Sequence, residues 1–152
     1  MISDQEFLHG AAFLRLMNLG QPITVTHASS IHPSIYIVSS LTKLSGILFK
    51  VSTKSRSAWS FTFSDQEDKA INILKSKYLG IKVFAALVCH RDGVCCLSED
   101  QLFTVFDSDS PIFTGQRISV SRKSHSSYHV NGARKARMEK TVPQNAWPKL
   151  VV

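Results

Sequence analysis

The feature that most constrains the fold of this chain is an unbroken apolar run, Val83–Cys89. A strand with one face in water alternates polar and apolar residues, but this run shows no alternation. It is also far shorter than the ~20 residues of a membrane-spanning helix. It therefore predicts a strand buried on both faces, the central strand of a mixed sheet. The turn His90–Gly93 and the run Val94–Leu97 predict an antiparallel hairpin partner for this strand.

Residue patterns typical of helix starts predict three helices, two before this strand in the sequence and one after its hairpin partner. Ser3 with Glu6, and Ser64 with Glu67, have the spacing of capping boxes, in which a hydroxyl and a carboxylate satisfy the first backbone N–H groups of a helix. Apolar residues follow both boxes at helical spacing. Ser98 is expected to open a third, shorter helix that ends at about residue 106.

Short β-rich runs fill the intervals between the helices. The predicted strands are 23–26, 35–38, 47–52 and 58–63 before the second helix, and 117–122 and 127–130 near the C-terminus. In the fourth run, Trp59, Phe61 and Phe63 share one face, which is typical of core packing against a helix.

This order predicts a mixed α/β (α+β) fold in which a single central mixed sheet is flanked by helices. With 152 residues, 43% of them hydrophobic, the chain is long enough to form one domain with a substantial core. We expect that domain to cover residues 1–152. Its core would lie at about 3–107, and a β-rich basic segment would follow at about 117–149.

Basic residues are concentrated near the C-terminus. The chain has 18 Lys plus Arg against 11 Asp plus Glu, and residues 1–116 hold ten of each. Eight basic residues lie from Arg117 onward, where the sequence opposes them with Glu139 alone. A one-sided basic segment predicts a polyanionic partner, above all nucleic acid. A solvated basic tail and a contact with an acidic protein surface are the alternatives.

The three cysteines indicate a reducing compartment. Cys89, Cys95 and Cys96 flank one predicted turn, and neighbouring residues of a strand point to opposite faces. We therefore expect buried free thiols and no metal site. The first residues are acidic, and no apolar run could span a bilayer, so we expect neither a secretory signal nor a membrane partner. These features predict a cytoplasmic protein.

Several enzyme classes have no motif here. The glycines form neither GxGxxG nor a P-loop, and GxSxG does not occur, so nucleotide-binding loops and a hydrolase elbow are not expected. Two acidic pairs, Glu67–Asp68 and Glu99–Asp100, lie at predicted helix starts, where the helix dipole already explains them.

The stretch Ile47–Lys54, together with the order helix, three strands, helix, strand, resembles the restriction-endonuclease-like superfamily, also called PD-(D/E)XK nucleases. The resemblance covers roughly residues 3–90. In that family a Pro-Asp pair and a (D/E)-X-K motif on the next strand hold a divalent metal, and the lysine steers the attacking water. Here Pro33–Ser34 takes the place of Pro-Asp, and Leu48–Lys50 takes that of (D/E)-X-K. Lys50 is retained, and both acids are replaced.

This substitution pattern implies a degenerate, inactive nuclease core without a cofactor, because magnesium needs hard oxygen ligands. Some members of the family carry an acid on the following helix, which makes Glu67 or Asp68 a candidate replacement ligand. Glu6 matches the family's acid on the first helix. An active enzyme would therefore use Lys50, Glu6 and Glu67 with Mg²⁺, and cleave DNA.

The stretch 119–137 contains small hydroxyl residues, two histidines, a tyrosine and five basic residues. Hydroxyls and long basic side chains donate to phosphates, and a tyrosine stacks on bases. The residues expected to contact nucleic acid are Arg122, Lys123, His125, Tyr128, Arg134, Lys135 and Arg137. A polar hairpin on a basic surface is the alternative.

Three functions remain open from the sequence. The first is binding of nucleic acid, DNA before RNA, by a degenerate nuclease core acting in a defence, repair or mobile-element complex, as the resemblance implies. The second is an active metal-dependent DNA endonuclease. The third is an inhibitor or adaptor that docks its basic face on an acidic protein.

Overall fold

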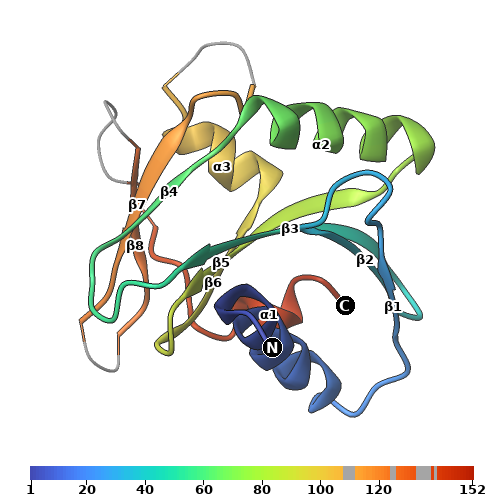
Figure 1. The fold of residues 1–152 in the computed structure, drawn as a ribbon, viewed down its shortest axis with the longest axis horizontal. Helices are drawn as coiled ribbons and strands as arrows, with labels where there is room; N and C mark the ends of the chain where they lie inside the picture. The colour runs from blue at the N-terminus through green and yellow to red at the C-terminus, as the bar shows by residue number, and fades with distance from the viewer. Residues whose placement is uncertain (108–111, 124–125, 133–137, 139) are drawn as a thin grey trace.

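The computed structural model describes residues 1–107, 112–123, 126–132, 138 and 140–152. Its larger sheet has the strand order β1-β2-β3-β5-β6, with β3 and β5 parallel and the other neighbours antiparallel (Figure 1). These strands are β1 (Thr24–His27), β2 (Ile35–Ser39), β3 (Leu44–Ser52), β5 (Lys82–Cys89) and β6 (Gly93–Ser98). The mixed sheet predicted from the sequence is confirmed.

The apolar run that predicts a buried strand forms β5. Every residue of Val83–Cys89 is buried, because neighbouring strands pair with both edges of β5 and helices cover the sheet. The middle place in the strand order belongs to β3, so β5 is an interior strand rather than the central one. Its hairpin partner is β6, as expected, with Cys89 opposite Gly93.

Three strands form a second, antiparallel sheet in the order β4-β7-β8. They are β4 (Trp59–Thr62), β7 (Arg117–Ser121) and β8 (His129–Gly132). The fourth predicted strand therefore leaves the larger sheet and pairs with the C-terminal strands, with Trp59 opposite Val120. Its aromatic face is buried, as predicted, and Phe63 packs there against Phe113.

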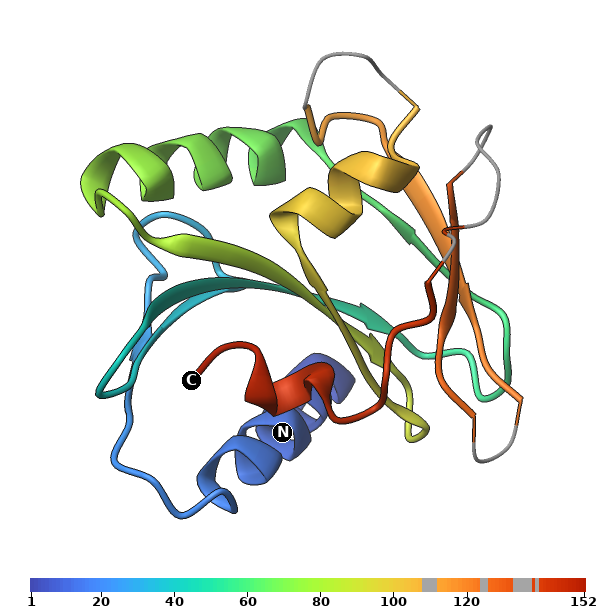
Figure 2. The ribbon, with the colours of Figure 1, turned by 180° about the vertical axis from the view of Figure 1, so that it is seen from behind.

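Helices cover both faces of the five-stranded sheet (Figure 1, Figure 2). Ser3 and Ser64 cap two of them as predicted, and the helices are α1 (Asp4–Met17), α2 (Asp65–Lys77), α3 (Glu99–Val105) and α4 (Ala146–Lys149). On one face α4 lies beside α1, and the Trp147 indole N–H donates to the Ala12 carbonyl at 3.0 Å. On the other face α2 packs so closely on β3 that a Cβ on Gly46 would overlap the Leu74 side chain.

The cysteines belong to the core. Cys89, Cys95 and Cys96 are free and buried, as predicted. Burial raises the pKa of all three thiols, that of Cys96 to about 12. At neutral pH they are therefore protonated, apolar packing groups rather than nucleophiles.

Candidate nucleic-acid interface

Arg122, which directly follows β7, is held inside the protein. Its Nε and Nη2 atoms donate to the two carboxylate oxygens of Asp92 at 2.8 and 2.7 Å, and Nη1 donates to the Ser126 carbonyl at 3.3 Å. The side chain is 12% exposed. This bidentate pairing holds the pKa of Asp92 below its ordinary value. Arg122 thus positions other groups, which corrects the expectation that it contacts phosphate.

Tyr128 is fully buried against the same pair. Its hydroxyl donates to Asp92 Oδ2 at 3.1 Å, and the Arg122 guanidinium carbon lies 5.6 Å from the ring centroid. Burial raises the pKa of the Tyr128 hydroxyl. The expectation that Tyr128 stacks on a base is wrong, because its ring has no exposed face.

Arg122 and Asp92 join three connections that lie far apart in the sequence. We call them together the three-loop edge: residues 53–58 between β3 and β4, 90–92 between β5 and β6, and the described residues of 122–128 between β7 and β8. The Arg122 N–H donates to Ser57 Oγ at 3.2 Å. The His90 N–H donates to the Ser52 carbonyl at 3.0 Å. The described parts of the three connections gather at the lower left of Figure 1.

The three-loop edge exposes a cluster of positive charge. Its exposed cations are Lys54, Arg56, Arg91 and Lys123. Among the described residues of these loops, Asp92 is the sole carboxylate, and Arg122 neutralises it. Ser55 lies between Lys54 and Arg56 in the sequence, and Ser57 follows Arg56. Long cations interleaved with hydroxyls are the donors that phosphate groups accept.

Lys50 and Glu67 lie in contact, as an active nuclease requires, but they are paired with each other and largely buried. The Lys50 ammonium donates to both carboxylate oxygens of Glu67 at 2.8 Å and to the Thr62 carbonyl at 2.7 Å. Glu67 Oε1 also accepts from the Ser64 N–H, which caps α2. The pair ties β3 to the start of α2. Its side chains are only 18% and 7% exposed.

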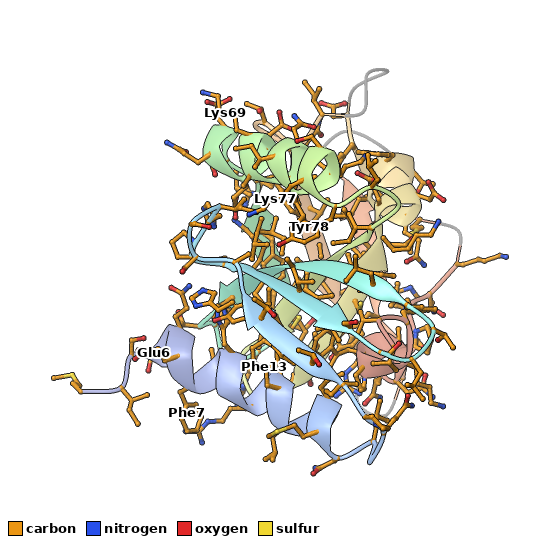
Figure 3. All side chains as sticks on the ribbon, turned by 90° about the vertical axis from the view of Figure 1, so that its right-hand side faces the viewer. Glu6, Phe7, Phe13, Lys69, Lys77 and Tyr78 are labelled. Atoms are coloured by element: carbon orange, nitrogen blue, oxygen red, sulfur yellow. The ribbon has the colours of Figure 1, made fainter. Side chains whose placement is uncertain are left out.

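Glu6 does not join this pair. It lies on α1, across the sheet from α2, as its position relative to Lys69 and Lys77 shows (Figure 3). Its Oε2 accepts from the Ser3 N–H at 2.8 Å, which lowers the pKa of Glu6. The expected catalytic set of Lys50, Glu6 and Glu67 is therefore divided between two faces of the sheet. In the described part of the chain, no three His, Cys, Asp or Glu residues are grouped to hold a metal ion.

The predicted basic stretch is described only in part. Lys123 is exposed, as a phosphate contact requires. His125, Arg134, Lys135 and Arg137 lie outside the described residues.

The sequence interpretation missed Lys54, Arg56 and Arg91. The signal that could have found two of these positions is the sheet topology. Parallel strands end at the same edge of a sheet, so the residues that follow β3 and β5 meet there. Lys54 and Arg91 each follow one of these strands by two residues.

Two further findings concern the lengths of the helices and the likeness of the chain to known proteins. Among the described residues, no helix is both long enough and apolar enough to cross a membrane. Comparisons with protein-family models, with curated proteins and with solved structures find no match to this chain.

Proposed function

We propose that the protein binds nucleic acid, DNA in the first place, through the three-loop edge. One observation carries this proposal. The Arg122–Asp92 pair neutralises the carboxylate of the edge and leaves Lys54, Arg56 and Arg91 exposed beside Lys123. Their charge is not cancelled by acids within the described loops. Such a cluster on short loops between strands favours a polyanion whose charges are regularly spaced.

The degenerate nuclease core remains part of this proposal. The element order resembles that of the nuclease family: α1, β1, β2, β3, α2 and β5, with β4 inserted before α2. The Phe49 N–H donates to the Ser34 carbonyl at 2.9 Å, so the two motif positions lie side by side. Leu48 is fully buried. A core without its motif acids would bind without cleaving, as one subunit of a DNA-directed complex.

A salt series on paired variants tests the binding. The edge variant is Arg56→Gln, Arg91→Gln and Lys123→Gln, and the control with the same charge is Lys77→Gln, Lys82→Gln and Lys149→Gln. All six side chains are exposed. Each lost phosphate contact should reduce the magnitude of the log–log salt slope by about 0.9, so we expect a reduction of about 2.7 for the edge variant. We expect little change for the control.

Fluorescence anisotropy of short labelled duplex and single-stranded DNA supplies these slopes. Equal losses in the two variants would contradict the proposed edge. Absence of salt-dependent binding by the wild-type protein would direct attention to the third hypothesis, an acidic protein partner of an inhibitor or adaptor.

The same samples, incubated with Mg²⁺ and run on a denaturing gel, test for cleavage. We expect intact strands, because Lys50 and Glu67 are paired with each other. Cleavage that Lys50→Ala abolishes would support the active endonuclease instead. Within the proposal, the protein acts in the cytoplasm, and its three buried free thiols support a reducing compartment.

A further inference from the structure

A depression of about 420 Å³ lies beside the three-loop edge, between α1 and the β5–β6 hairpin. The buried side chains of Leu8 and Val94 form its base, and the 58% exposed Phe7 forms part of its wall. Figure 3 shows Phe7 on the outer side of α1, whereas Phe13 lies between α1 and the sheet. The volume falls within the range of about 300–1,000 Å³ that is typical of ligand pockets.

Cationic side chains surround this apolar base. Arg15 and Arg91 line the depression and are exposed, and neither guanidinium forms a salt bridge or donates a hydrogen bond within the described residues. The Arg15 guanidinium lies over the hairpin, 3.5 Å from where a Cβ on Gly93 would stand. His90 lines the same wall from a left-handed backbone conformation, with φ of 49°. The lining therefore suits an anion that carries an apolar part.

A smaller hollow of about 110 Å³ adjoins the depression and shares Phe7, Leu8, His90 and Arg91 with it. Asp4 lines this hollow but not the depression. Of the described residues that line either space, Asp4 is the sole carboxylate. The larger depression is therefore the more favourable place for a phosphate.

We propose that the depression binds one unpaired nucleotide of a strand held along the three-loop edge. The base would pack against Phe7 and the apolar base of the depression, and its phosphate would lie between Arg15 and Arg91. This inference rests on the proposed function. Arg91 belongs both to the edge and to the depression, so a strand that follows the edge reaches the depression without a break. A paired base could not enter, and this predicts a preference for single-stranded over duplex DNA.

Phe7→Ala is the decisive variant, and Leu14→Ala is its matched control. Both side chains are exposed on α1, at 58% and 54%, but Leu14 does not line the depression. Loss of a base–aromatic contact should weaken single-stranded DNA binding about tenfold in Phe7→Ala. Duplex binding should not change, and Leu14→Ala should bind both forms like the wild type. Arg15→Gln should also weaken the single strand selectively.

The emission of a strand that carries a single 2-aminopurine gives an independent readout. We expect wild-type protein and Leu14→Ala to change this emission, and Phe7→Ala to leave it close to that of the free strand. A ratio of single-strand to duplex affinity that is the same in Phe7→Ala and Leu14→Ala would overturn the inference. If the edge variant binds all DNA as tightly as the wild type, the proposed function itself fails. The two failures are therefore distinguishable.

Discussion

Among individual side chains, Asp92 joins the turn between β5 and β6 to the connection between β7 and β8. Its two oxygens accept from Arg122 and from the Tyr128 hydroxyl, so one carboxylate holds the turn before β6 against the strands of the second sheet. Gly93 makes this possible. Its φ is +152°, and a Cβ there would lie 2.6 Å from the Tyr128 hydroxyl oxygen. The shape of the three-loop edge therefore depends on a glycine, an aspartate and an arginine.

Arg122→Gln separates this structural role from phosphate binding. We expect it to lower the free energy of unfolding by about 2 kcal/mol, because a partly buried carboxylate loses its charged donors. Lys123→Gln, one residue further and exposed, should leave the unfolding free energy unchanged. Urea denaturation of both variants at pH 7 measures this difference. Unchanged stability in Arg122→Gln, with a salt slope reduced by about 0.9, would assign it to phosphate instead.

The pH dependence of this pair follows from the lowered pKa of Asp92. The group has its ordinary pKa of 3.8 in the unfolded chain and a lower pKa in the folded protein. The stabilisation is therefore present above pH 3.8 and is lost as the pH falls through the folded value. Urea denaturation below pH 4 should show a smaller difference between Arg122→Gln and the wild type than denaturation at pH 7.

Among the secondary-structure elements, β3 and β5 determine where the edge lies. Their parallel pairing places Ser52 opposite Cys89, so the loops that follow both strands emerge together. The capping boxes of α1 and α2 were predictable, because each depends on residues only three positions apart. The pairing of β4 with β7 was not, because Trp59 and Val120 lie far apart in the chain and no local pattern identifies a partner strand.

The contact between β8 and the end of α3 offers a test of the packing between elements. A Cβ on Gly132 would overlap the Val105 carbonyl, and a backbone atom cannot move aside as a flexible side chain can. Gly132→Ala should therefore lower the free energy of unfolding by about 1–3 kcal/mol. Gly10→Ala on α1 is the control, because its Cβ would meet nothing within 4 Å and alanine favours the helix. Thermal melting distinguishes them, and equal melting temperatures would contradict the close contact.

For the whole molecule, charge counting predicted basic and aromatic contact residues, two of which the structure largely buries. The C-terminal excess of positive charge pointed to Arg122 and Tyr128, because their residue types suit phosphate and base contacts. Composition does not record the direction of a side chain. Asp92, thirty residues before Arg122, turns both groups inward. The exposed cations instead include Lys54, Arg56 and Arg91, which come from the part of the chain with no net charge.

Global stability should fall in mild acid because of His9. Its ring lies 4.9 Å from the Phe49 ring, and Nε2 has no hydrogen-bond partner in the described structure. Burial, and to a smaller extent His27, lower the pKa of His9 below 6.5. The unfolded chain therefore binds a proton first, and stability is lost as the pH falls below about 6.5. Urea denaturation at pH 7.5 and pH 5 should show a smaller pH effect in His9→Leu than in the wild type, and equal effects would contradict this role.

The three-loop edge can form only late in synthesis. It needs β7, which pairs antiparallel with β4, and the inward-pointing Arg122 that follows β7. A chain that grows from the ribosome has made all of the five-stranded sheet by Ser98, before Arg117–Ser121 exists. The loop at 53–58 then has no Arg122 to hold it, and Asp92 lacks its salt-bridge partner Arg122. Nascent chains should therefore have weaker affinity than the finished protein for DNA or RNA, including the ribosomal RNA around them, until synthesis is nearly complete.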